Sequence, residues 1–265
     1  MSDSWRQPRR ILMTGLGLLT VLYLLAPTLV IIPMSFTESR ILSFPPQGFT
    51  LEWYERIVTD RQWSTAIANS VQVAVLTTIL STVLGTLAAL AFGRGRFPGK
   101  TALNGLVLAP LIVPVVIVAI GMFSLYVRWR LGGSLVGLVL AHTALALPFV
   151  VVSVSASLRT MDRNLELAAA NLGASPRQTF RLVTLPIILP GVVAGAIFAF
   201  ITSWDEVVVA IFLTSARFRT LPVEMWEQVR QAVDPTVAAV ATTLLVVTTM
   251  LLLVLLVVRR PAAAQ

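Results

Sequence analysis

Cysteine is absent from the 265 residues, and histidine and lysine occur once each, as His142 and Lys100. Without cysteine the chain can form no disulfide and no thiolate metal site, and a lone histidine needs carboxylate ligands beside it to hold a metal. Charged residues make up only 12% of the chain, about half the share of an ordinary soluble domain. Because 57% of the residues are hydrophobic, the composition favours a membrane protein over soluble domains.

Long charge-free runs separate the few charged clusters. They lie between Arg10 and Glu38, Arg61 and Arg94, Lys100 and Arg128, Arg130 and Arg159, and Asp234 and Arg259. Each run exceeds the roughly 20 residues that a helix needs to cross the hydrocarbon core of a bilayer. A further apolar stretch, 187–213, is interrupted only by Asp205 and Glu206.

These runs predict an all-α membrane protein, because backbone groups in lipid must be hydrogen-bonded within a helix or a closed barrel. The six predicted spans are 11–33, 66–92, 102–127, 134–158, 187–213 and 237–258. The first span exceeds a typical signal-peptide core and lacks a small-residue cleavage site, so we expect it to remain as a span. The predicted organisation is an N-terminal segment 1–10, a six-span domain 11–258 and a tail 259–265.

The isoelectric point near 11.3 is compatible with nucleic-acid binding, but the basic residues flank apolar runs and form no continuous basic face. With the N-terminus inside, the inner segments hold twelve basic residues against eight in the outer segments. Basic residues favour the cytoplasmic side of a membrane. The count therefore predicts a multi-pass membrane protein with both termini cytoplasmic, and the separated basic clusters predict no nucleic-acid partner.

The two long outer loops are each predicted to contain a short helix. Loop 34–65 is expected to carry an interfacial helix, with Trp53, Tyr54 and Trp63 at the level of the lipid headgroups. Loop 214–236 is expected to carry a helix around residues 223–232.

Prolines predict irregularities in several spans. Pro110, Pro114 and Pro148 lie inside predicted spans and are expected to kink them. Pro186 and Pro190 are expected to end the helix that precedes the fifth span.

The inner loop 159–186 carries the signals of a helix–turn–helix. Asp162 can cap a helix over residues 165–172, and Gly173 supplies a left-handed stop. Ser175, the proline after it and the glutamine three residues on form a capping box for a second helix. The small Ala168-Ala169-Ala170 surface lets another protein's backbone approach closely. A structured connector without a binding role is the alternative interpretation.

This loop resembles the EAA motif of binding-protein-dependent ABC importer permeases. The resemblance rests on Glu166-Leu167-Ala168-Ala169-Ala170-Asn171-Leu172-Gly173-Ala174-Ser175, followed by Leu185-Pro186 and Pro190-Gly191. It implies a type I importer fold whose coupling helix docks in a groove of the ATPase subunit. The residues that this role implies as contacts are Glu166, Ala168, Ala169, Leu172, Gly173, Ala174, Ser175 and Arg177. The chain departs from the motif at Leu167, where the family usually has glutamate.

The later half is similar to the second permease subunit of spermidine/putrescine importers. The similar residues are Ser203-Trp204-Asp205-Glu206-Val207-Val208-Val209-Ala210, Phe212-Leu213-Thr214, Arg219-Thr220-Leu221-Pro222 and Asp234-Pro235. The resemblance implies uptake of a polyamine. It also implies a heterodimer with a second permease, two ATPase subunits that bind ATP and Mg²⁺, and an external substrate-binding protein. No cofactor is expected on this chain itself. Permeases for iron, thiamine or sulfate share the scaffold and remain alternatives.

Asp205 and Glu206 are the acidic residues within a predicted span. A carboxylate in hydrocarbon costs several kcal/mol, so each is expected to face protein or a watery cavity. One interpretation is a cation path to which Trp204 adds a cation–π face; the other is a structural pair. Adjacent helical residues point about 100° apart, so one of the two acids is expected to line the path. His142 is expected to be a hydrogen-bonded histidine inside the membrane, and a role in transport is the alternative interpretation.

Two other classes of function are less consistent with the sequence. A secondary transporter driven by an ion gradient would need intramembrane ion ligands, and only Asp205, Glu206 and His142 are available. An intramembrane enzyme would need a Ser/His/Asp or His-x-x-x-His grouping, which the spans do not show. The segment 95–101 looks like a phosphate loop but has three residues between its glycines where the motif needs four, and it is predicted to be a tight basic turn.

Overall fold

The computed structural model describes residues 6–231 and 234–258. Residues 1–5 of the predicted N-terminal segment and the predicted tail 259–265 lie outside the described residues. The chain divides into two compact units, one of Met1–Asp60 with Glu227–Val246 and one of Arg61–Trp226 with Val247–Gln265. Apart from one isolated bridge between Ser215 and Phe218, the regular structure of the described part is helical.

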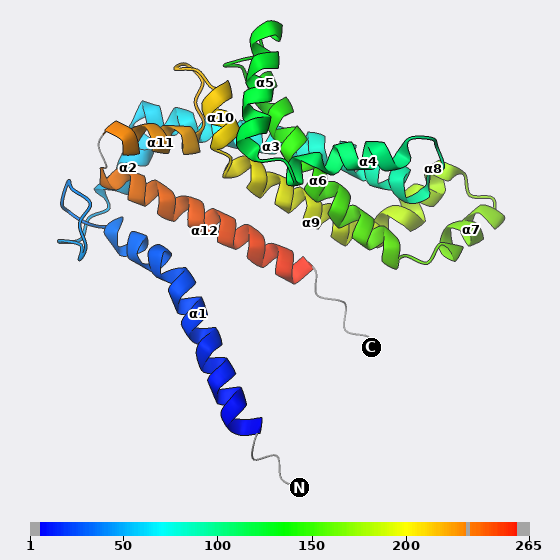
Figure 1. Ribbon diagram of the computed structural model, residues 1–265, viewed down its shortest axis with the longest axis horizontal. Coiled ribbons are helices and arrows are strands. Elements are labelled where there is room, and N and C mark those ends of the chain that lie inside the picture. The colour runs from blue at the N-terminus through cyan, green and yellow to red at the C-terminus, as the bar shows by residue number, and fades with distance from the viewer. Residues whose placement is uncertain (1–5, 232–233, 259–265) are drawn as a thin grey trace. The chain divides into compact units, whose positions relative to one another are not determined.

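The helices follow the apolar runs of the sequence (Figure 1). Their bounds are α1 Arg6–Met34, α2 Glu52–Thr59, α3 Arg61–Arg94, α4 Lys100–Leu108, the 3₁₀ turn η2 Ala109–Leu111, α5 Val115–Trp129, α6 Leu135–Thr160, α7 Asn164–Asn171, α8 Pro176–Thr179, the π-helical turn η3 Phe180–Thr184, α9 Leu185–Trp204, α10 Val208–Leu213, α11 Leu221–Gln231 and α12 Pro235–Val258. Within the described residues, five helices are long and apolar enough to cross a membrane, or six if one bent pair counts as a span. The predicted all-α membrane class is confirmed.

The third predicted span, 102–127, is not one continuous helix. The chain turns by 106° between the segment Lys100–Leu111 and the helix Val115–Trp129. Pro110 and Pro114 explain the break, because proline donates no backbone hydrogen bond and its ring clashes with the preceding turn. Two prolines four residues apart therefore produce a bend much sharper than the predicted kink. Pro148, in contrast, lies inside the continuous helix α6.

The fifth predicted span, 187–213, has different ends in the structure. It begins earlier, because the helical segment runs from Pro176 to Trp204. Pro186 and Pro190 do not end the preceding helix as predicted; the chain passes them through η3 into α9. A π-helical turn widens the helix, and here it ends at Thr184, two residues before Pro186, whose ring would clash with a carbonyl of a regular α-helical turn. The span then stops at Trp204.

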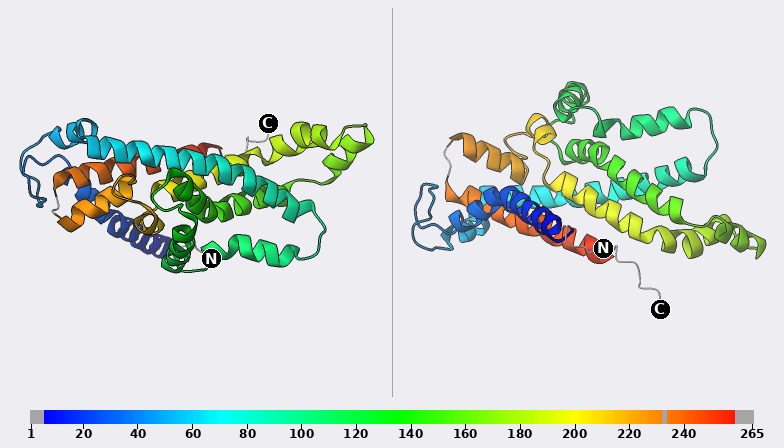
Figure 2. Two further views of the ribbon diagram at one scale, coloured as in Figure 1. Left: turned by 90° about the horizontal axis from the view of Figure 1, so that it is seen from above. Right: turned by 60° about the horizontal axis from the view of Figure 1, so that its bottom comes forward.

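The larger unit is built on α3, α6 and α9, which pack against one another side by side (Figures 1 and 2). Val150 of α6 is fully buried at their centre. A Cβ at Gly85 of α3 would lie 2.6 Å from the Val150 side chain, and one at Gly195 of α9 would lie 3.0 Å from the Val150 backbone. The missing side chains of these two glycines allow the helices to approach closely, as small residues do in membrane helix packing.

The smaller unit holds the predicted helix of loop 34–65, which is α2. The Trp53 Nε1–H donates to the backbone oxygen of Thr37 at 2.6 Å, and the Trp53 side chain is 3% exposed. Tyr54 hydrogen-bonds Ser35 through the two hydroxyl groups at 2.6 Å. The helix is therefore confirmed. The prediction that Trp53 anchors it among the lipid headgroups is wrong, because its side chain packs against protein. Trp63, in the larger unit, is likewise 3% exposed.

Candidate functional site

The loop 159–186 folds into the predicted helix–turn–helix. The helix α7 starts at Asn164, whose N–H donates to the Asp162 carboxylate at 2.9 Å, and Gly173 follows it with a φ of +84°. The Ser175 N–H donates to Gln178 Oε1 at 2.8 Å, and the Gln178 N–H donates to Ser175 Oγ at 3.4 Å. The predicted stop and capping box are both confirmed. Figure 2 shows α7 and α8 projecting beyond the ends of α3, α6 and α9.

Large apolar side chains are exposed on this hairpin. Leu167 is 54% exposed and Leu172 is 89% exposed, although each is a large hydrophobic side chain. Ala168, Gly173, Ser175 and Arg177 are exposed as well, and Ala169 and Ala174 are half-buried. Large apolar side chains that are exposed outside the membrane spans mark surfaces that contact another protein.

Glu166 turns away from this exposed surface and fastens α7 to the larger unit. Its Oε2 lies 3.1 Å from Nε of Arg94 at the end of α3. Its Oε1 accepts a hydrogen bond from the Thr184 hydroxyl at 2.8 Å, so the same carboxylate also contacts η3. Glu166 therefore holds the hairpin in place, and its neighbour Leu167 points outward.

Asp205 and Glu206 lie at the break between α9 and α10, and their environments differ. Glu206 is 9% exposed, and its two oxygens accept hydrogen bonds from the N–H groups of Val209 and Ala210, both at 2.9 Å. The carboxylate thereby satisfies the free backbone donors at the start of α10, which explains why a new helix begins there. Asp205 is exposed.

Trp204 is 5% exposed, and its ring stacks on Phe200 with centroids 5.7 Å apart. Its predicted contribution to a cation path stays a prediction.

His142 is buried and hydrogen-bonded, as expected. Its Nδ1 lies 2.8 Å from Ser203 Oγ, and its Nε2 lies 3.7 Å from Glu206 Oε2. The fold therefore assembles a Ser/His/Glu group that the sequence did not reveal, because Ser203 and His142 belong to different spans. The three side chains are each 9% exposed or less, so they are not accessible to a substrate in this structure. Their contacts connect α6 to the break after α9. Among the described residues no group of three His, Cys, Asp or Glu could hold a metal ion.

A family model for the inner membrane component of binding-protein-dependent transport systems matches residues 81–262. This match covers well over half of the chain. The chain belongs to this family. Members of this family are membrane permease subunits of ABC transporters and not enzymes, and a separate subunit hydrolyses ATP. Family membership thus decides against both the ion-driven transporter and the intramembrane enzyme.

Relatives within the binding-protein-dependent family differ in substrate. The putrescine permease PotI of Escherichia coli (strain K12) is 33% identical over 243 residues, covering 89% of this chain and 85% of PotI. The spermidine/putrescine permease PotC of the same strain is 33% identical over 232 residues, 88% of each chain. The trehalose permease SugB of Mycobacterium tuberculosis (strain CDC 1551 / Oshkosh) is also 33% identical, over 205 residues that cover 76% of this chain and 75% of SugB.

Solved ABC importers share the fold of this permease. A bacterial importer of the acidic polysaccharide alginate superposes with a TM-score of 0.77 at 16% identity, over 98% of this chain and 99% of that chain. The inward-facing methionine importer MetNI superposes with a TM-score of 0.58 at 19% identity, over 76% of this chain and all of that chain. These likenesses establish the type I importer permease fold. The chain is a multi-pass inner-membrane permease subunit of an ABC importer.

Proposed function

We propose that this permease takes up a polyamine such as putrescine or spermidine. The proposal rests on the 33% identity to PotI and PotC, which extends over 88–89% of this chain. A polyamine is a chain of separated cationic amines, so its path needs acceptors that attract positive charge without trapping it. Asp205 is an exposed carboxylate at a break between helices, and it offers such an acceptor. Glu206 serves α10 and is not expected to contact the substrate.

The helix–turn–helix of α7 and α8 is the proposed docking site for the ATPase. The single observation that carries this assignment is the exposed apolar surface of Leu167 and Leu172 on a rigidly capped hairpin. A coupling element must move as one body with the spans, and the contacts of Glu166 with Arg94 and Thr184 supply that connection. The EAA-like residues Ala168 and Ala169 add the small surface that a groove in the ATPase can enclose.

The remaining parts of the proposed assembly follow from this placement. The ATPase side of the membrane is cytoplasmic, so both termini are assigned to the cytoplasm. The chain pairs with a second permease in a heterodimer, and two ATPase subunits bind ATP and Mg²⁺ below it. An external binding protein delivers the substrate; one of the solved alginate importers, with a TM-score of 0.68 to this chain, is in complex with such a periplasmic protein. ATP-driven closure of the ATPases would tilt the spans as rigid bodies and give alternating access.

A sugar is the second candidate substrate, because SugB is as similar in percentage identity as PotI, though over less of the chain. A neutral sugar gains only hydrogen bonds from a carboxylate, whereas a cationic amine gains a charge interaction as well, so the exposed Asp205 favours the cation.

The test is uptake by the purified importer. The full-length chain is isolated with the subunits that co-purify with it and is reconstituted in vesicles with the external binding protein. We expect ATP-dependent accumulation of labelled putrescine or spermidine and no accumulation of labelled trehalose. Accumulation of trehalose alone would replace the polyamine with a sugar. Transport in vesicles that contain no ATPase subunit would contradict the proposed assembly.

A further inference from the structure

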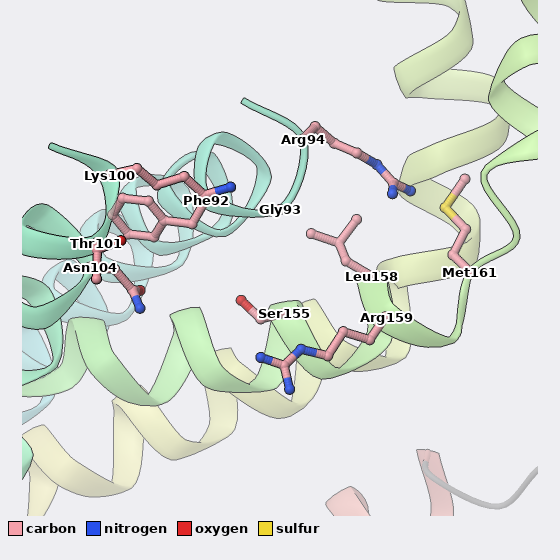
Figure 3. Close-up of a pocket in the computed structure, with 10 residues that line it drawn as sticks. All are labelled: Phe92, Gly93, Arg94, Lys100, Thr101, Asn104, Ser155, Leu158, Arg159 and Met161. Carbon is pink, nitrogen blue, oxygen red and sulfur yellow. The ribbon is translucent and has the colours of Figure 1, made fainter. Parts of the chain in front are cut away.

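A basic cavity of about 380 Å³ lies at the end of the larger unit that carries the α7–α8 hairpin. Its polar lining comes from three elements: the end of α3, the start of α4 and the last turns of α6 (Figure 3). The polar side chains are Arg94, Lys100, Thr101, Asn104, Ser155 and Arg159. Three of these are cations and none is a carboxylate. Figure 3 shows the polar groups of Lys100, Asn104, Ser155 and Arg159 around a common space, with the Arg94 guanidinium turned toward Met161.

The positive charge of this cavity is only partly compensated. Arg94 shares its charge with Glu166, while Lys100 and Arg159 form no ion pair within the described part of the chain. An anion in the cavity would therefore meet positive charge that the chain itself neutralises only at Arg94.

The backbone adds to the same field. Helix α4 begins at Lys100 after Gly99, which has a φ of +78° and provides no side-chain cap. The first N–H groups of a helix have no partner within the helix and carry partial positive charge. Lys100 also donates from Nζ to the backbone oxygen of Gly95 at 3.1 Å, which closes the segment 95–99 into the basic turn that the sequence predicted. The cavity therefore combines two unpaired cations, an uncapped helix start and hydroxyl and amide donors.

We infer that this cavity binds a phosphate-bearing anion, such as the headgroup of an acidic phospholipid. Phosphate oxygens are the acceptors that arginine forks and free N–H groups recognise best. The cavity also lies where α3 and α6 end, so it is at the depth of the headgroups on the hairpin side of the membrane. Phe92 and Leu158 line its apolar wall, and the α4 side chains Leu103 and Leu106 are exposed for contact with acyl chains. Basic pockets between spans are known sites for acidic lipid headgroups.

The segment 95–101 does not bind a nucleotide in this scheme. It lacks the spacing and the preceding strand of a phosphate loop, and the anion is held by side chains of three helices. The inference depends on the position of the cavity in the membrane and is independent of the transported solute.

The experiment measures lipid retention by the purified full-length chain in native mass spectrometry. Phosphatidylglycerol or zwitterionic phosphatidylcholine is titrated into the chain, and the apparent affinities are compared. We expect preferential binding of phosphatidylglycerol that Arg159→Gln weakens about fivefold, the effect of removing one basic residue near an anionic headgroup. The control is Arg128→Gln, which removes an equivalent exposed charge outside the cavity and leaves the affinity unchanged. Lys100→Gln is the second cavity variant if Arg159→Gln does not fold.

A second arm separates a lipid from a soluble ligand. Inorganic phosphate is added to the chain in phosphatidylcholine, and the thermal midpoint is compared with that in chloride at equal ionic strength. A thermal midpoint that phosphate raises, and that Arg159→Gln no longer shows raised, supports a soluble phosphate as the ligand. Preferential binding of phosphatidylglycerol without an effect of phosphate on the midpoint supports the lipid headgroup. Equal behaviour of Arg159→Gln and Arg128→Gln in both arms would overturn the inference.

Discussion

Arg94 and Glu166 join the end of α3 to the proposed coupling helix through one contact of 3.1 Å between Nε and Oε2. The two side chains are 26% and 20% exposed, so the pair is partly shielded from water. Glu166 also accepts from Thr184, which makes it a junction between α3, α7 and the helical segment that leads into the membrane. Movement of the hairpin is thereby tied to two separate spans.

The first prediction concerns this contact. Glu166→Gln keeps the size and the acceptor for Thr184 but removes the charge that Arg94 faces. Because a partly exposed pair contributes about 1 kcal/mol or less, assembly should survive. We expect reduced transport per ATP hydrolysed, measured as uptake and phosphate release by the same reconstituted complex. The double variant with Arg94→Gln should be no worse than the single one, and additive losses would show that the two residues act independently.

The second prediction concerns Gly173, whose φ of +84° places it in the left-handed region. Gly173→Val forces a β-branched residue into that region at a cost of about 1 kcal/mol or more. No atom lies within 4 Å of the position that a Cβ would occupy, so the cost comes from the backbone and not from a clash. We expect Gly173→Val to bind the ATPase less tightly in co-purification.

Asparagine tolerates the same conformation better than other non-glycine residues, so Gly173→Asn is the matched control. It should retain most of the ATPase. Equal recovery of the ATPase with both variants would place the interface elsewhere.

The third prediction separates the two acidic residues. Asp205→Asn should lower polyamine uptake per assembled complex, because it removes an exposed charge and leaves the buried contacts intact. Glu206→Gln should instead lower the yield of assembled complex. The two oxygens of the Glu206 carboxylate accept one hydrogen bond each, from the N–H groups of Val209 and Ala210, and the glutamine amide has only one such oxygen. Uptake normalised to assembled complex distinguishes the two effects, and normal normalised uptake in Asp205→Asn would remove this residue from the path.

The fourth prediction tests the orientation of the chain. Single cysteines need no background removal because the chain has none. Ala216→Cys and Ser175→Cys both introduce a thiol at an exposed position, in the loop before α11 and in the hairpin respectively. In sealed cells an impermeant maleimide should modify the first and not the second. Modification of Ser175→Cys from outside would reverse the topology.

Local chemistry explains what the sequence predicted well. The capping box of Ser175 and the helix stop at Gly173 depend on a few consecutive residues, so both could be predicted from the sequence. The spans followed from charge-free runs, because the bilayer penalises charge regardless of tertiary contacts. The break after Trp204 was not visible. It depends on Glu206 folding back on the N–H groups that follow it, and the apolar residues on both sides of Asp205 and Glu206 favoured one continuous span.

Contacts between spans explain the rest. The sequence singled out Glu166 by its motif and gave no sign of Arg94 as its partner, because the two lie on different helices. His142 was expected to find a hydrogen bond, but Ser203 could be identified as its partner only from the packing of α9 on α6. The basic turn 95–101 was recognised, while the contribution of Arg159 to the same cavity came from the end of a distant span.

The π-helical turn η3 determines the direction in which the hairpin faces. A π-helical turn contains an extra residue compared with an α-helical turn, and each residue of an α-helix rotates the chain by about 100°. Removing one residue from Phe180–Thr184 would make the segment a regular helix and rotate α8 by that angle about the axis of α9. The exposed leucines would then face a different side, and Glu166 would leave Arg94. The π-helical turn thus sets the rotation of the segment outside the membrane relative to the membrane-spanning part of the same helix.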